Sequence, residues 1–160
     1  MPDLEDFQVF LDDISICFIE EHFAGWENRI LLPFSMVTSA GTVAFEDVRG
    51  LRENFEHYLT ACRVLRIDAI VRRPVELVEC EDGTLLGTYE TELLSHGVRV
   101  TDPYTSNALM CCCGGVLKMS SILNAKGHHS WTGVYPVAEN IAENGLGFPK
   151  KSAALYKSAS

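Results

Sequence analysis

The sequence is short of basic residues, with 13 lysines and arginines against 22 acidic residues among its 160. The resulting formal charge of −9 argues against nucleic acid and anionic membranes as partners, because both bind basic surfaces. No apolar run approaches the roughly 20 residues of a membrane span, and the first residues, MPDLEDF, are acidic where a signal peptide would be basic. These absences predict a cytoplasmic protein that binds neither nucleic acid nor membrane.

The sequence also lacks the spacings that bind metal ions or phosphate groups. Cys111, Cys112 and Cys113 are consecutive, and on a strand they would point to alternate faces, so they cannot converge on one metal ion. No glycine-rich phosphate loop occurs, since the glycines stand at predicted turns or alone. Disulfides are not expected, because the other marks of a secreted scaffold are missing. We predict no metal, nucleotide or other cofactor, and six reduced cysteines.

Two segments have the apolar spacing of amphipathic helices. In residues 3–21 an apolar stripe recurs every three or four residues, and Asp3 can cap the first turn. We expect this helix to end near residues 24–25. Residues 47–62 show the same spacing and open at Asp47, which predicts a second helix.

The remaining segments have the alternation and the turn residues of an antiparallel sheet. Short strands are expected at residues 32–38 and 42–45, and longer ones at 65–80 and 84–95. A further long strand is expected to start at residue 98 and to run through a bend at Asp102-Pro103 into a hairpin at 104–125. The hairpin turns at Gly114-Gly115, and its first arm carries almost no charge. A strand that is apolar on both faces belongs at the middle of a sheet. The predicted order is helix, short hairpin, helix and an antiparallel meander.

Four stretches of sequence accompany this order: GWENRILLPF after the first helix, FEDVRGLRENFEHYL, DGTLLGTYETELLSHGVRVTDPYTSNALM and GVLKMSSILNA. Together with the order of elements, they resemble the nuclear transport factor 2-like superfamily, and within it the SnoaL-like branch. The resemblance implies an α+β, cystatin-like fold, with N-terminal helices packed on a strongly curved antiparallel sheet that encloses an apolar pocket. We predict a single domain over residues 1–131 and a C-terminal extension over residues 132–160, loosely ordered at its end. Dimers are common in this superfamily, and we expect a homodimer formed through the outer sheet face.

The resemblance does not point to one reaction, because its members share no catalytic motif. They include ketosteroid isomerases, polyketide cyclases and scytalone dehydratase-like lyases. The isomerases use a base, a protonated aspartate and a tyrosine donor, and the first two positions match Thr38 and Ser106 here. The predicted first helix contains no tyrosine, so ketosteroid isomerisation is disfavoured.

Histidines are the candidates for a catalytic base, because an imidazole titrates near neutral pH. His128 and His129 are adjacent near the end of the resemblance, and His57 lies on the predicted second helix. Each is also explained as a solvated residue without a role. Glu90 and Glu92 share one face of a strand, and we expect that face to point outward, solvated or paired with arginines.

Period-two alternation predicts which side chains line the pocket. The expected wall consists of Tyr89, Ser106, Met110, Met119, Ser121 and Leu123, and the expected lid of Trp26, Phe34 and Tyr58. Such a pocket suits a small apolar ligand that carries hydroxyl or carbonyl groups. Three functions stay open: a small-molecule-binding protein; a cofactor-free lyase, isomerase or cyclase with a histidine base; and an interaction module with a vestigial pocket.

Overall fold

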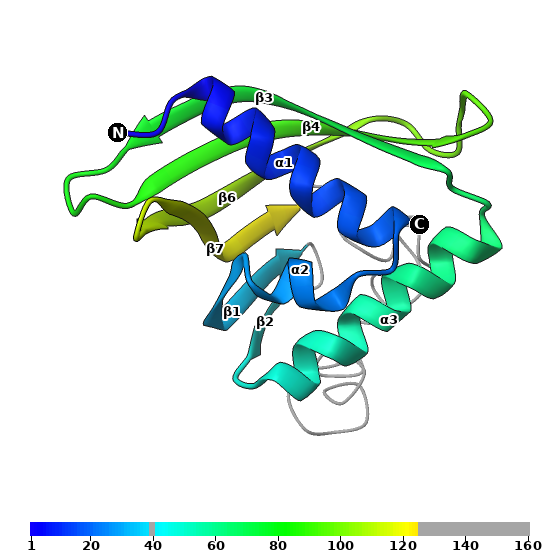
Figure 1. Cartoon of the computed structure of the whole chain (residues 1–160), viewed down its shortest axis with the longest axis horizontal. Helices are drawn as coiled ribbons and strands as arrows, with labels where there is room; N and C mark the ends of the chain where they lie inside the picture. The colour runs from blue at the N-terminus through cyan, green and yellow to red at the C-terminus, as the bar shows by residue number, and fades with distance from the viewer. Residues whose placement is uncertain (39–40, 125–160) are drawn as a thin grey trace.

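The computed structural model describes residues 1–38 and 41–124, which form three helices and seven strands (Figure 1). The helices are α1 (Leu4–Ile19), α2 (Phe23–Glu27) and α3 (Val48–Val64). The strands are β1 (Ile30–Thr38), β2 (Gly41–Phe45), β3 (Ala69–Glu79), β4 (Leu85–Ser95), β5 (Val98–Arg99), β6 (Tyr104–Cys113) and β7 (Val116–Asn124). No helix within these ranges is long and apolar enough to cross a membrane.

Two aspartates set the starts of the long helices, as predicted. The carboxylate of Asp3 accepts a hydrogen bond from the backbone N–H of Asp6, and the Asp6 side chain accepts one from the backbone of Asp3, which completes a capping box. Asp47 caps α3 in the same way by accepting from the N–H of Gly50. The first helix ends earlier than predicted because Glu21 has a φ of 55°, and the chain then forms the short helix α2.

The sheet has the strand order β2-β1-β7-β6-β4-β3, with β5 also paired to β4. All pairs are antiparallel except β1 and β7, which run parallel with Ser35 opposite Ser121. The α+β prediction is confirmed, but the sheet is mixed and not purely antiparallel. The reason is that β2 occupies one edge of β1, and the hairpin of β6 and β7 brings β7 to the other edge in the same direction as β1.

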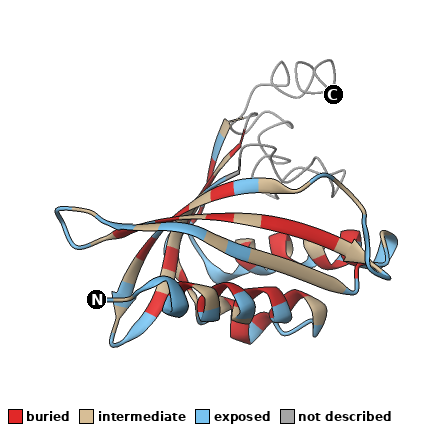
Figure 2. Ribbon diagram, turned by 90° about the horizontal axis from the view of Figure 1, so that it is seen from above, coloured by how far each residue is buried: buried red, intermediate tan, exposed pale blue. Residues whose placement is uncertain are grey.

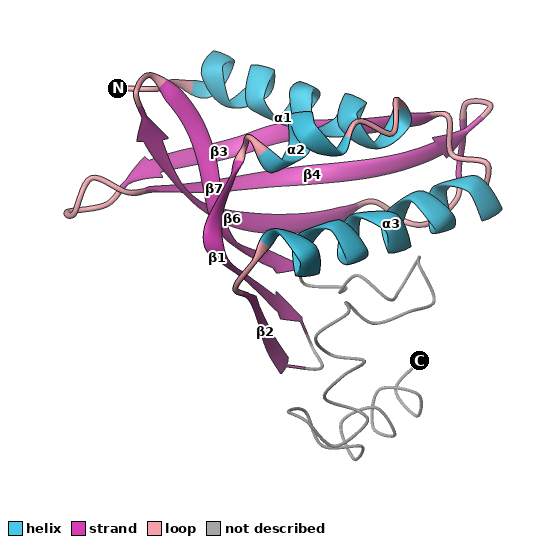
Figure 3. Cartoon of the chain, turned by 60° about the horizontal axis from the view of Figure 1, so that its bottom comes forward, coloured by secondary structure: helices cyan, strands magenta, loops and turns pink. Residues whose placement is uncertain are grey.

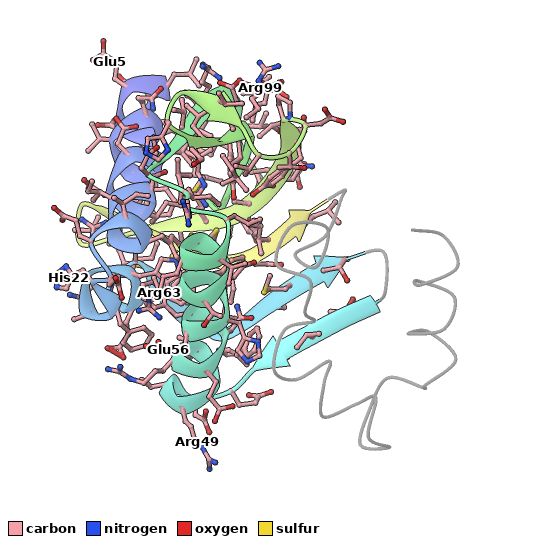
Figure 4. The ribbon with its side chains drawn as sticks, turned by 90° about the vertical axis from the view of Figure 1, so that its right-hand side faces the viewer. Glu5, His22, Arg49, Glu56, Arg63 and Arg99 are labelled. Atoms are coloured by element: carbon pink, nitrogen blue, oxygen red, sulfur yellow. The ribbon has the colours of Figure 1, made fainter. Side chains whose placement is uncertain are left out.

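All three helices lie on one side of this curved sheet (Figures 1 and 3). Each long helix carries both buried and exposed residues along its length, as expected of an amphipathic helix packed on a sheet (Figure 2). Glu5 of α1 and Arg49 of α3, for example, project away from the core (Figure 4). The core between the layers is rich in phenylalanine: Phe7 and Phe55 are fully buried. Burying each such side chain stabilises the fold by roughly 1.5–3 kcal/mol.

The strand prediction was wrong at Asp102-Pro103. We expected a bend inside one long strand, but the chain forms two strands there, β5 and β6, separated by residues 100–103. Both strands pair with β4. Pro103 has no N–H to donate, so it cannot continue a hydrogen-bonded ladder, and the break falls where this donor is missing.

Candidate functional site

A cavity lies between the inner face of the sheet and the three helices. Its lining comes from both layers: Ile14, Phe18, Trp26, Phe34, Met36, Asn54, Tyr58, Ile70, Arg72, Tyr89, Thr91, Tyr104, Ser106, Met119 and Ile122. The space between its walls is about 580 Å³ when its open mouth is included. The enclosed cavity volume is only about 50 Å³, so the interior is narrow.

Aromatic rings form the apolar part of the lining. Phe18 of α1 packs against Trp26 and Tyr58 with ring centroids 5.9 and 5.5 Å apart, and both pairs are edge-to-face. Trp26 also contacts Phe34 of β1 at 6.2 Å. Because each ring has at least one aromatic neighbour, these side chains hold one another in place. The result is a pre-formed wall to which a flat or apolar molecule can pack.

Arg72 of β3 is the charged residue of the lining. Its Nη1 donates to Ser15 Oγ at 2.7 Å, and its guanidinium carbon lies 5.8 Å from the centroid of the Phe18 ring. Its Nε is buried and has no hydrogen-bond partner among the described residues. No carboxylate in residues 1–38 and 41–124 forms an ion pair with Arg72. The cavity therefore contains a guanidinium without a counter-ion in the described part of the chain.

Asn54 of α3 is a second polar group with unused bonding capacity. The side chain is 1% exposed, and its Nδ2 donates only to Met36 Sδ, at 3.6 Å. Its Oδ1 has no donor in the described part of the chain. Buried carbonyl oxygens are nearly always hydrogen-bonded in folded proteins, so this atom has an unmet need for a donor.

Two tyrosines supply hydroxyl groups at the sheet side of the cavity. Burial raises the pKa of Tyr104 to about 12, and it also raises the pKa of Tyr89, while the nearby Arg72 opposes both shifts. The Ser106 side chain, through a hydrogen bond, also opposes the rise in the pKa of Tyr89. Both phenols therefore stay protonated at neutral pH and act as hydrogen-bond donors, not as bases.

The described lining contains no aspartate, glutamate, histidine or cysteine. Proton abstraction needs such a base within reach of the substrate. His57 is half-buried on α3 but does not line the cavity, and His128 and His129 lie outside the described residues. No cluster of potential metal ligands occurs within the described ranges. These described residues can bind and orient a molecule, but they offer no group for acid–base chemistry at neutral pH.

Most of the residues expected in the pocket come together in it. Trp26, Phe34, Tyr58, Tyr89, Ser106 and Met119 all line the cavity. Met110 is fully buried but lies under α1, close to Gly87 and Phe7, and not in the cavity lining.

Ser121 and Leu123 were placed on the wrong face. A bulge in β7 opposite Leu109 and Met110 shifts the alternation, so Ile122 lines the cavity in their place. Ser121 instead accepts a hydrogen bond from Ser35 at 2.9 Å between hydroxyl oxygens, and the Leu123 side chain is 44% exposed.

The sequence analysis also missed several lining residues, above all Arg72 and Asn54. In the sequence, Arg72 alternates with the apolar residues Val71 and Ala69, which favours the outer face of the strand, but Ile70 and Arg72 line the cavity. Its neighbour Arg73 points outward. The sequence did contain a signal for an inward arginine, because the side chains of two adjacent arginines on a strand must point to opposite faces of the sheet.

The outer face carries the two glutamates, as predicted. Glu92 Oε2 accepts from Arg73 Nη2 at 2.8 Å, and Glu92 Oε1 from Arg99 Nε at 2.7 Å. Glu90 lies 4.0 Å from Arg73. Hydrogen bonds from Arg73 and then from Arg99 hold the pKa of Glu92 below its ordinary value. Glu92 is therefore ionised, and both glutamates belong to a cross-strand cluster with arginines outside the cavity.

Solved structures identify the fold. It is similar to that of Aln2 from a Streptomyces species, with a TM-score of 0.60 at 12% identity over 79% of this chain and 93% of that chain. A cystatin-like domain of unknown function from Nostoc punctiforme has a TM-score of 0.58 at 8% identity over 96% of each chain. An NTF-2 like protein of unknown function from Shewanella oneidensis has a TM-score of 0.55 at 6% identity over 76% of this chain and 98% of that chain.

At these identities the similarity shows the fold alone. The chain has the nuclear transport factor 2-like fold, and the predicted superfamily fold is confirmed. No protein-family model and no curated protein sequence matches the chain. The function is therefore argued from the cavity itself.

Proposed function

We propose that the protein binds a small molecule in the cavity between sheet and helices. The observation that carries this proposal is a narrow aromatic cavity with buried polar atoms, Arg72 Nε and Asn54 Oδ1, that lack hydrogen-bond partners in the described chain. Ligand sites typically combine an apolar lining with a few convergent polar groups. A bound molecule would supply the missing partners and fill the space.

Binding without turnover is the version that the described lining supports, because it contains no general base. The alternative, a cofactor-free lyase, isomerase or cyclase, would need its base from outside the described residues, where His128 and His129 lie. In the third function, an interaction module, the cavity would be vestigial. Both alternatives make different predictions for the experiment below.

The test is retention of small molecules from a cell extract. The purified protein is incubated with the extract, separated by gel filtration and denatured, and the released compounds are identified by mass spectrometry. The matched control is Met119→Trp, since Met119 lines the cavity and the larger ring should fill it. We expect one or a few compounds to be enriched over the control. Equal recovery from both proteins would refute a binding function, and a chemically altered compound would favour the enzyme.

We further propose that the protein is a cytoplasmic homodimer whose single domain spans residues 1–131, followed by an extension over 132–160. Support for association comes from the outer sheet face, where Leu86, Leu109 and Leu123 are 41%, 37% and 44% exposed. Exposed apolar groups on one sheet face favour pairing with a second copy. The cytoplasmic location is supported by six free thiols, of which Cys112 is exposed.

A further inference from the structure

The geometry of Arg72 points to a more specific ligand: we infer that the cavity binds a small ring-shaped carboxylate, with its anion held by Arg72. The inference rests on the proposed binding function and adds the charge and shape of the ligand. Arg72 is half-buried among Phe18, Tyr89 and Tyr104, with its Nε buried. A cation in such apolar surroundings is normally paired with an anion.

None of the described groups that face Arg72 supplies this negative charge. Ser15 and Phe18 approach it from α1, Thr91 stands opposite it on β4, and Tyr104 lies beside Thr91 on β6. The main-chain oxygen of Arg72 accepts from Gln8 Nε2 at 2.9 Å, which fixes the strand against α1 but leaves the guanidinium charge uncompensated. The described surroundings are therefore hydroxyl groups and rings.

The unused edge of the guanidinium has the shape of a carboxylate site. In any arginine, the Nε–H bond and one Nη2–H bond are parallel, and together they bind both oxygens of a carboxylate. In Arg72 the hydrogen bond to Ser15 uses Nη1, so it occupies the other side of the group. Nε has no partner in the described chain. A carboxylate bound at this edge would satisfy Nε and neutralise the charge in one step.

The rest of the cavity indicates the body of the ligand. The cavity volume of about 50 Å³ suits a single ring, and so do the aromatic walls formed by Phe18, Trp26 and Phe34. Asn54 Oδ1, on α3, needs a hydrogen-bond donor. A hydroxyl group on the ring would supply it. The ligand class is thus a hydroxylated aryl carboxylate, anionic at the Arg72 end and donating at the Asn54 end.

The test compares matched probes by isothermal titration at pH 7.5. The acids are 4-hydroxybenzoate, 4-hydroxyphenylacetate and 4-hydroxycinnamate, which differ in length, and each is paired with its neutral primary amide. We expect the best acid to bind at least tenfold more tightly than its amide. Removal of the ring hydroxyl, as in cinnamate for 4-hydroxycinnamate, should also weaken binding, and Asn54→Leu should remove that difference.

Arg72→Met is the decisive variant, and Arg73→Met is its control, because Arg73 is adjacent but points to the outer face. The acid-to-amide ratio should fall to about one in Arg72→Met and stay unchanged in Arg73→Met. If circular dichroism shows that Arg72→Met does not fold, Arg72→Gln takes its place. The ratio of acid to amide affinity in the wild-type protein also tests the inference without any variant. Equal binding of acid and amide by the wild type would overturn this inference and leave the binding function standing. If no probe binds, this inference fails, while the retention experiment still decides the binding function separately.

Discussion

Gly87 of β4 marks a close approach of α1 to the sheet, and Gly87→Ala should therefore destabilise the protein. A Cβ at this position would lie 2.5 Å from Phe7 Cζ and 2.7 Å from Met110 Cε. Both side chains are fully buried, so the Phe7 ring cannot move away unless α1 moves with it. We expect a loss of about 1–3 kcal/mol in the free energy of unfolding, the usual range for overpacking a core.

The assay is urea unfolding followed by circular dichroism, with Gly50→Ala in α3 as the matched control. At Gly50 the nearest atom to a new Cβ would be Phe45 Cδ1 at 3.2 Å, so Phe45 need shift only slightly. Alanine gains roughly 0.5–1 kcal/mol over glycine inside a helix, which offsets that shift. The control should therefore be nearly neutral. A change of less than about 0.5 kcal/mol in Gly87→Ala would refute the close packing of α1 on β4.

A double variant separates this contact from other effects of the new methyl group. Phe7→Leu removes the ring atoms that a Cβ at position 87 would meet, and leaves space that the methyl group can enter. The combined variant should lose less stability than the sum of the two single variants, by at least about 0.5 kcal/mol. Additive losses would show that Phe7 and residue 87 are not in contact.

Four further predictions concern the cavity, the outer face, the number of free thiols and their reactivity. Met119→Trp should abolish binding of the acid probes while costing about 1–3 kcal/mol of stability, measured by titration and by urea unfolding. Light scattering at micromolar concentration should find a dimer, and Leu109→Glu should convert it to a monomer; a wild-type monomer would end the dimer proposal. Thiol titration in denaturant should count six free cysteines, and a count of four would contradict it. In the native protein, burial raises the pKa of Cys62 to about 11, and the hydrogen bond with Cys113 raises the pKa of Cys111 to about 11. Because the thiolate is the reactive form, alkylation of both cysteines should be slow at pH 8 and should accelerate as the pH rises toward 11.

The fold could be predicted from the sequence because its signals are local. Asp3 and Asp47 begin the long helices, and two glycines with positive φ, Gly114 and Gly115, form the turn between β6 and β7. The inward face of β4 also follows from alternation, with Tyr89 2% exposed and Glu90 paired to Arg73 on the outer side. Each of these features depends on residues close together in the chain or on period-two spacing.

The features that the sequence did not reveal depend on contacts between distant segments. The parallel pairing of β1 with β7 joins residues 35 and 121, and no local pattern encodes it. The bulge in β7 inserts one residue and reverses the faces of Ser121 and Leu123. Alternation in β3 favours an outward Arg72, because an inward arginine is unfavourable on hydrophobicity alone. The structure places it inward, where Ser15 and Phe18 of α1 contact it.

This inward arginine is the feature that distinguishes the cavity from ordinary core. An apolar side chain at position 72 would pack among Phe18, Tyr89 and Tyr104 without desolvating a charge, and stability alone would favour it. The neighbouring Arg73, by contrast, has two carboxylates on the outer face. A cation retained in the cavity without a described partner is thus better explained by a ligand than by folding. Since a ligand that binds only the folded state stabilises it, the same contact that recognises the anion would offset the cost of partly burying the Arg72 charge.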